Sequence, residues 1–333
     1  MSANEARMQP RPVRGLSRFD WRSLLVAGWS LALLSSALGQ AVQPEVGREV
    51  SRIQRPTLFP MVTGEGEEVA LAGELPQRKE YGVLRVLYDT RPLPWSTLQV
   101  FSGAFYTTNA ALVPDNEMDN WYFQQGFLLN LSKGFLEASL FPHASLYQAW
   151  FEYAEPGVQG VEDFSAMDAN VGVTYVIKKL WNLALSVDYT YERLANLKLA
   201  DEIFHENHFI VAANEVFAIS HTHFVFAQVF ADISLGTAPS SSARNDYGAF
   251  IGYAIDLTPE VTITLSYRYA LQDYTEGPHW DNNHSFALSL IWNITPWATA
   301  RLAAIYVLND ANIDAFNYNV FTGGPTASLN FQW

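Results

Sequence analysis

The feature that most constrains the fold is a strict alternation of apolar and polar side chains that recurs through the chain. Across residues 261–271, one set of alternate positions reads Val, Ile, Leu, Tyr, Tyr, Leu, and the other reads Thr, Thr, Ser, Arg, Ala. Successive side chains of a strand point to opposite faces, so this pattern predicts a strand with one apolar and one polar face. Segments 181–192, 285–294 and 326–333 repeat it.

The same alternation, followed along the whole chain, predicts twelve strands after residue 95. Most are 11–14 residues long, whereas strands of soluble sheets have about 5–6 and a tilted transmembrane strand needs about 9–11 for the hydrocarbon core. Five expected connections are short, among them a tight turn at 132–134, and they alternate with six long ones. An even strand number with short turns on one side and long loops on the other is typical of an outer-membrane barrel. The predicted strands lie near 97–107, 120–131, 135–153, 164–177, 181–193, 207–218, 221–234, 247–257, 261–271, 283–294, 297–308 and 321–333.

Composition excludes several other classes of protein. The 333 residues are 49% hydrophobic with a mean hydropathy of −0.01, yet no apolar run of 18 residues follows residue 40, which excludes a helical membrane protein. The net charge of −14 makes nucleic acid an unsuitable partner, because phosphate binding requires clustered Lys and Arg. The absence of cysteine excludes disulfide scaffolds, thiol catalysis and zinc–thiolate sites.

The chain divides into three parts. Residues 1–39 combine five arginines, an apolar stretch from residue 24 and small residues at the end, which predicts a secretory signal peptide; an uncleaved anchor helix is the alternative. The signal carries five of the 20 basic and two of the 34 acidic residues, so the remainder has a net charge of −17. Residues 40–95 hold six prolines and little periodicity, which predicts an extended periplasmic segment. Residues 96–333 are the predicted barrel domain.

With these features the chain resembles bacterial outer-membrane β-barrel proteins of the porin-like kind. The resemblance is carried by the signal, the twelve alternating segments and the closing sequence Leu-Asn-Phe-Gln-Trp at 329–333. In that family the last strand ends in an aromatic residue and is recognised by the barrel assembly machinery. Phe is the usual last residue, so Trp333 is a mild departure. The resemblance implies an all-β transmembrane antiparallel barrel in the outer membrane of a Gram-negative-type bacterium, surrounded by outer-membrane lipid.

The polar faces of the strands predict a water-filled lumen. An arginine that faces lipid at mid-membrane costs about 2–4 kcal/mol, so Arg268 and Arg301 are expected to face inward. Small residues such as Gly248 and Gly252 share the inward face and leave room for water. The charges either set up a field across the pore or pair and brace a closed lumen. The expected pore-lining residues are Asp168, Asn170, Asp188, Glu192, Arg268 and Arg301.

The long loops are strongly acidic. They hold fifteen acidic residues against two basic ones, and an acidic mouth attracts cations over about 8–10 Å at physiological salt. Tryptophans cluster at the short-turn ends, where amphipathic rings form the interfacial girdle of a barrel; these are Trp181, Trp292, Trp297 and Trp333. The expected acidic mouth includes Asp115, Glu117, Asp119, Asp201, Glu202 and Asp273.

Signals for catalysis or metal binding are weak. His143 and Ser145 have the H-x-S spacing of outer-membrane phospholipases, which are also twelve-stranded, but the Asn-Gly that follows the serine in that family is missing. A serine needs an oriented base to become a nucleophile. His205 and His208 stand at an expected loop edge, which predicts solvated or interfacial histidines. No nucleotide, cofactor or metal motif occurs, so neither a cofactor nor a metal is expected.

The sequence therefore predicts a passive, porin-like channel for small hydrophilic solutes with a preference for cations, and not an enzyme. A structural or adhesive barrel without an open pore is the alternative, and a phospholipase-like hydrolase is the third hypothesis. The transported solute and the oligomeric state stay open.

Overall fold

The computed structural model describes residues 95–115, 117–135, 139–157, 161–180, 183–220 and 222–333. Within them, twelve antiparallel strands form one closed barrel in which each strand pairs with its sequence neighbours and β1 pairs with β12. The predicted signal peptide and all but Trp95 of the predicted extended segment lie outside the described residues. The strands are β1 (Ser96–Thr107), β2 (Asn120–Ser132), β3 (Leu140–Tyr153), β4 (Phe164–Ile177), β5 (Leu183–Ala195), β6 (Glu202–Ala218), β7 (His223–Ala238), β8 (Arg244–Thr258), β9 (Val261–Tyr274), β10 (Trp280–Thr295), β11 (Ala298–Ala311) and β12 (Tyr318–Gln332).

The predicted twelve-stranded barrel is confirmed, but several strand ends differ from the expected ones. β6 begins at Glu202 rather than 207, and β8 begins at Arg244 rather than 247. These extensions are polar, so they resemble loops in the sequence although the backbone continues in the sheet. As a result, connections such as 239–243 and 312–317 have only five or six residues.

The prediction of a tight turn at 132–134 is wrong. β3 begins at Leu140, so the β2–β3 connection runs over residues 133–139. Phe135 forms an isolated bridge with Leu140, and its N–H donates to the Leu140 carbonyl at 2.8 Å. The predicted strand 135–153 therefore begins five residues before the observed one.

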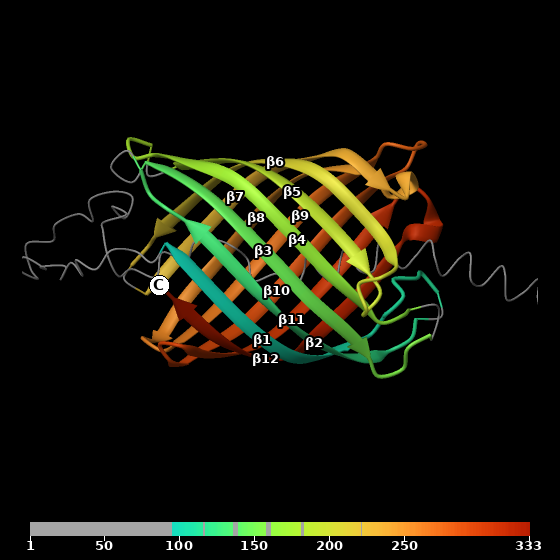
Figure 1. The fold of residues 1–333 in the computed structure, drawn as a ribbon, viewed down its shortest axis with the longest axis horizontal. Coiled ribbons are helices and arrows are strands. Elements are labelled where there is room, and N and C mark those ends of the chain that lie inside the picture. The colour runs from blue at the N-terminus through green and yellow to red at the C-terminus, as the bar shows by residue number, and fades with distance from the viewer. Residues whose placement is uncertain (1–94, 116, 136–138, 158–160, 181–182, 221) are drawn as a thin grey trace, which may run out of the picture.

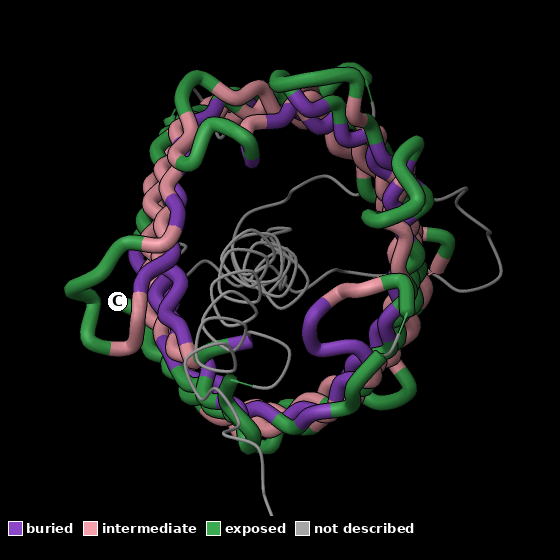
Figure 2. The backbone as a smooth tube through the Cα atoms, turned by 90° about the vertical axis from the view of Figure 1, so that its right-hand side faces the viewer, coloured by how far each residue is buried: buried purple, intermediate pink, exposed green. Residues whose placement is uncertain are grey.

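The two ends of the barrel differ. The short turns and the C-terminus lie at one end (left in Figure 1), and the longer loops lie at the other, with the short 3₁₀ helices η2 (Ser240–Ser242) and η3 (Asp314–Phe316). The last residue closes the ring, because Trp333 N–H donates to the Ser96 carbonyl at 3.2 Å and Ser96 N–H donates to the Trp333 carbonyl at 3.3 Å. Figure 2 shows the ring end-on. Closure leaves no strand edge unpaired. The described residues contain no helix long and apolar enough to cross a membrane.

The outer face of the barrel is apolar. On β9, Leu265 points outward and is 56% exposed, and it pairs with Leu288, which is 51% exposed. Large exposed apolar side chains recur on all sides, an arrangement that is stable only when lipid covers it. Trp292, Trp297 and Trp333 are all more than half exposed at the short-turn end, and Trp181 lies outside the described residues.

Much of the inner face is aromatic rather than small and polar. Phe101 on β1 stacks on Tyr147 of β3 at 6.0 Å between ring centroids, a contact between non-adjacent strands that only the concave inner face allows. Fifteen buried residues, Phe101 and Tyr147 among them, form an apolar cluster inside strands β1–β6. We call it the aromatic cluster. The prediction that small and polar residues line the lumen is therefore wrong for this wall.

Phenylalanine rings also cover the two glycines expected to open the lumen. Phe226 pairs with Gly252 and Phe230 with Gly248 across β7 and β8. A Cβ atom on Gly248 would lie 2.7 Å from the Phe230 ring and 2.2 Å from the Tyr269 carbonyl oxygen. Gly252 and Gly248 thus leave space for the rings of Phe226 and Phe230 on the neighbouring strand and do not open the lumen.

The inside–outside register can be tested by placing one arginine on either face of β9. We expect Leu265→Arg to destabilise the barrel by about 2–4 kcal/mol, because its guanidinium would face lipid. Thr264→Arg, the neighbouring inward position, is the matched control and is expected to cost much less. Urea unfolding in lipid vesicles measures both, and equal losses would contradict the register.

The glycine–phenylalanine pairing predicts a second effect on stability. Gly248→Ala should destabilise the barrel by about 1–3 kcal/mol, the usual cost of overpacking. Gly236→Ala on β7 is the control, because a Cβ atom there would meet nothing within 4 Å. A loss no larger for Gly248→Ala than for the control in the same unfolding assay would argue against close packing of Phe230.

Candidate functional site

A belt of ionisable side chains crosses the inner wall from β4 to β10. The strand register aligns its members: Asp168 pairs with Glu192, Glu192 with Glu206, and Asp232 with Asp246. We call this row the polar belt. Its six carboxylates are Asp168, Glu192, Glu206, Asp232, Asp246 and Asp281, and its cationic or protonatable partners are His208, Arg244, Arg268 and His279.

The β8–β10 part of the polar belt is closely paired. Arg244 Nε lies 3.0 Å from Asp246 Oδ1, and both side chains are almost completely buried. Arg268 Nη2 lies 3.8 Å from the other oxygen of Asp246, while its guanidinium stacks 5.2 Å from the centre of the Phe230 ring. Asp281 contacts His279 Nε2 at 2.7 Å. Pairs of this kind compensate for the cost of removing charges from water.

Within the described part of the chain, the β4–β7 part of the polar belt brings four carboxylates and one histidine together. Asp168, Glu192 and Glu206 stand side by side on three neighbouring strands, each at most 5% exposed. His208 joins them from β6, and its Nδ1 lies 2.5 Å from Asp232 Oδ1. His208 is 2% exposed, so the interpretation of this residue as a solvated or interfacial histidine is wrong. Its neighbour His205 is partly exposed and contacts Glu202.

The structure places all six predicted pore-lining residues on the inward face. Asp168, Glu192 and Arg268 are part of the polar belt. Asn170 Nδ2 donates to Thr190 Oγ1 at 3.0 Å. The other two, Asp188 and Arg301, make contacts outside the belt.

These two local contacts bear on the charge arrangement. Asp188 lies 2.6 Å from His143 Nε2, a contact that joins β5 to β3. Arg301 donates from Nε and Nη2 to Ser289 Oγ at 3.2 and 2.8 Å. β11 and β5 are on opposite sides of the twelve-stranded ring, but each charge has a partner on its own side. The Asp188 and Arg301 side chains therefore make their contacts within their own side of the ring and not across the lumen.

The predicted acidic mouth is distributed over the long-loop end. Its members in the β1–β2 loop, residues 115, 117 and 119, are exposed, and Asp119 accepts a hydrogen bond from Tyr106. Asp201 accepts from Asn196 at 2.6 Å, and Glu202 pairs with Arg193 at 3.0 Å. Asp273 lies within β9 on the outward side and is exposed.

Three acids assigned to loops lie instead inside the barrel. Glu206, Asp246 and Asp281 belong to β6, β8 and β10 and are at most 2% exposed. The assignment failed because these strands extend further toward the long-loop end than the alternation indicated. Part of the negative charge predicted for the mouth is therefore carried by the inner wall.

His143 and Ser145 face inward on β3 but do not form a dyad. His143 Nε2 contacts Asp188, and its Nδ1 lies 3.2 Å from the Phe141 carbonyl oxygen. With both ring nitrogens engaged, neither is available to accept a proton from Ser145. Ser145 pairs with Asn130 and Asn170 in the strand register.

The β1–β2 loop folds against the inner wall. Asn109 is fully buried, and its Nδ2 donates to the Val113 and Asn319 carbonyls at 2.7 and 3.1 Å. Ala111 is fully buried against the aromatic cluster. Leu112, with a φ of 51°, packs near Val307 of β11. This loop narrows the interior at the long-loop end.

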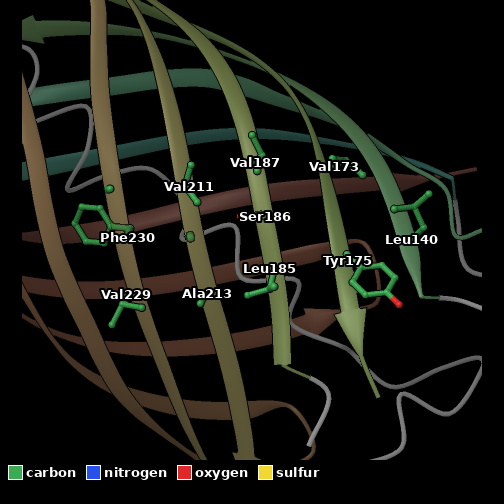
Figure 3. Close-up of a pocket in the computed structure, with 12 residues that line it drawn as sticks. Leu140, Val173, Tyr175, Leu185, Ser186, Val187, Val211, Ala213, Val229 and Phe230 are labelled. Carbon is green, nitrogen blue, oxygen red and sulfur yellow. The ribbon is translucent and has the colours of Figure 1, made fainter. Parts of the chain in front are cut away.

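A shallow depression of about 540 Å³ lies on the outer wall over β3–β7. It forms where the small residue Ala213 lies between larger outward side chains such as Val187, Val211 and Val229 (Figure 3). These neighbours are about half exposed. Because this surface is at membrane depth, acyl chains fill the depression and it offers no site for a polar solute.

Comparisons with known proteins give distant likenesses only. No family model matches the chain, and no curated protein matches it. Among solved structures it is similar to an outer membrane channel from Pseudomonas putida F1 (12% identity, TM-score 0.47, covering 72% of this chain and 97% of that one) and to the channel DcaP of Acinetobacter baumannii (11%, 0.41, 71% and 96%). It is also similar to outer membrane phospholipase A from Escherichia coli (12%, 0.42, 69% and 92%).

At these identities and TM-scores, the likenesses do not assign a function. The class of the protein is therefore argued from the barrel itself. Twelve long strands close without an edge, lipid-facing residues form a continuous apolar surface, and the inner wall carries the charges. The chain is a closed twelve-stranded antiparallel β-barrel with the architecture of an outer-membrane barrel.

Proposed function

We propose that the barrel is a passive channel for small hydrophilic solutes and that it prefers cations. The observation that carries this proposal is the polar belt, in which six inward carboxylates stand beside two arginines and two histidines among the residues that the structure describes. A low-dielectric wall with excess negative charge attracts cations and repels anions. The exposed acids of the β1–β2 loop, Asp115, Glu117 and Asp119, add to the same field at the entrance.

A barrel without an open pore is the second candidate. The aromatic cluster and the inward-folded β1–β2 loop favour it, because both occupy space inside the ring. Catalysis is not part of the proposal, since His143 has no nitrogen available for Ser145. For assembly, we propose that the machinery recognises β12 with its terminal Trp333, whose indole is 52% exposed.

Conductance in planar bilayers tests the channel. We expect the purified barrel to conduct and, under a KCl gradient, to give a reversal potential of the sign for cation selectivity. No conductance would favour the closed barrel, and anion selectivity would refute the proposed preference.

The contribution of the mouth can be isolated by neutralising Asp115, Glu117 and Asp119 together as D115N/E117Q/D119N. We expect the reversal potential to move toward zero at 0.1 M salt but to change little near 1 M, where the screening length falls to about 3 Å. Asp310→Asn is the matched control, because Asp310 is exposed on the outward side of β11. A shift of equal size in the control would point to a nonspecific surface-charge effect.

Both ring nitrogens of His143 have hydrogen-bond partners. We therefore expect the barrel to hydrolyse no phospholipid. Fatty-acid release from mixed micelles should stay at background for the wild type and for Ser145→Ala alike. Release by the wild type that disappears in Ser145→Ala would instead support the hydrolase.

A further inference from the structure

Three carboxylates of the polar belt lie directly opposite one another on adjacent strands. Asp168 pairs with Glu192, and Glu192 pairs with Glu206. Like charges in direct cross-strand register repel, and the repulsion grows where water is excluded, as it is for residues 1–5% exposed. A cation held between such carboxylates offsets this repulsion.

His208 brings a nitrogen ligand to the same place. One ligand atom from each of Asp168, Glu192 and His208 lies within 4.8 Å of the other two. The imidazole is 2% exposed, and its Nε2 is buried with no hydrogen-bond partner in the described part of the chain. A buried ring nitrogen without a partner is costly, so this atom points to a ligand that the cluster would hold.

The other nitrogen of His208 is already fixed. Nδ1 lies 2.5 Å from Asp232 Oδ1 on the next strand. Histidines that bind metals commonly donate the second ring N–H to a carboxylate, which sets the tautomer and leaves the opposite nitrogen as the ligand. The Asp232–His208 pair therefore has the arrangement of a metal-bound histidine and its supporting carboxylate.

We propose that Asp168, Glu192 and His208 bind one divalent transition-metal ion of the Zn²⁺ type on the inner wall of β4, β5 and β6. Two carboxylate oxygens and one imidazole nitrogen suit such ions, whereas Ca²⁺ and Mg²⁺ prefer oxygen ligands alone. The ion would lie between the Asp168 and Glu192 carboxylates and the His208 imidazole, and it would join three neighbouring strands. Three protein ligands leave a coordination position open toward the lumen. This site departs from the expectation that the chain binds no metal.

Metal binding can be measured on the purified full-length barrel in detergent, freed of metal by a chelator. We expect calorimetric titration with ZnCl₂ to give one ion per chain. Asp168→Asn, Glu192→Gln and His208→Ala should each weaken binding by at least ~100-fold, and Asp232→Asn by about 10–100-fold through the orientation of His208. No binding by the wild type at pH 7.5 would overturn the site and indicate bound protons instead.

His205→Ala is the matched control. His205 is three residues from His208 on the same strand, but its side chain is partly exposed and contacts Glu202. We expect it to bind zinc as the wild type does. Loss of binding in this control, or unchanged binding in all three ligand variants, would assign the ion to the surface and refute the proposal.

The mobility of unheated samples on denaturing gels shows whether each ligand variant folds. If one does not fold, a measurement on the wild type alone still tests the proposal. The X-ray absorption spectrum of the zinc-loaded wild type should require one nitrogen ligand from imidazole together with oxygen ligands. A shell without imidazole would overturn the proposal. Neither readout uses conductance, so the metal site and the channel can fail independently.

Discussion

Backbone hydrogen bonding in a medium without water is the constraint on which the rest of the structure depends. Each peptide group at membrane depth must find a partner inside the protein, and a sheet can meet this demand only by closing on itself. The pairing of β1 with β12, completed by the reciprocal bonds between Ser96 and Trp333, removes the last two edges. Closure also fixes the inward face of every strand, so it determines which side chains meet in the interior.

The interior has two different walls. Strands β1–β4 contribute most of the aromatic cluster, which packs like the core of a soluble protein, and strands β4–β10 carry the polar belt. The inward-folded β1–β2 loop, held by Asn109, lies against the aromatic wall. The described charges of the interior are therefore concentrated on one wall and its aromatic rings on the other.

The sequence predicted the parts that depend on a clear difference between the two faces. β9 alternates strictly, and its apolar residues, such as Leu265, do face outward. On β7 the inward Phe226 and Phe230 alternate with outward valines, so both faces are apolar and hydropathy cannot distinguish them. His208 was predicted to lie at a loop edge, because the polar start of β6 resembles a loop in the sequence. Its meeting with Asp168 and Glu192 depends on the pairing of three strands, which local patterns do not encode.

Two of the connections at the long-loop end are short, which limits what this part of the rim exposes. Between β7 and β8, and again between β9 and β10, only five residues link the strands. Exposed loop tips are the preferred sites of proteolytic cleavage and of tolerated insertions. Five residues offer little room for either on this part of the rim.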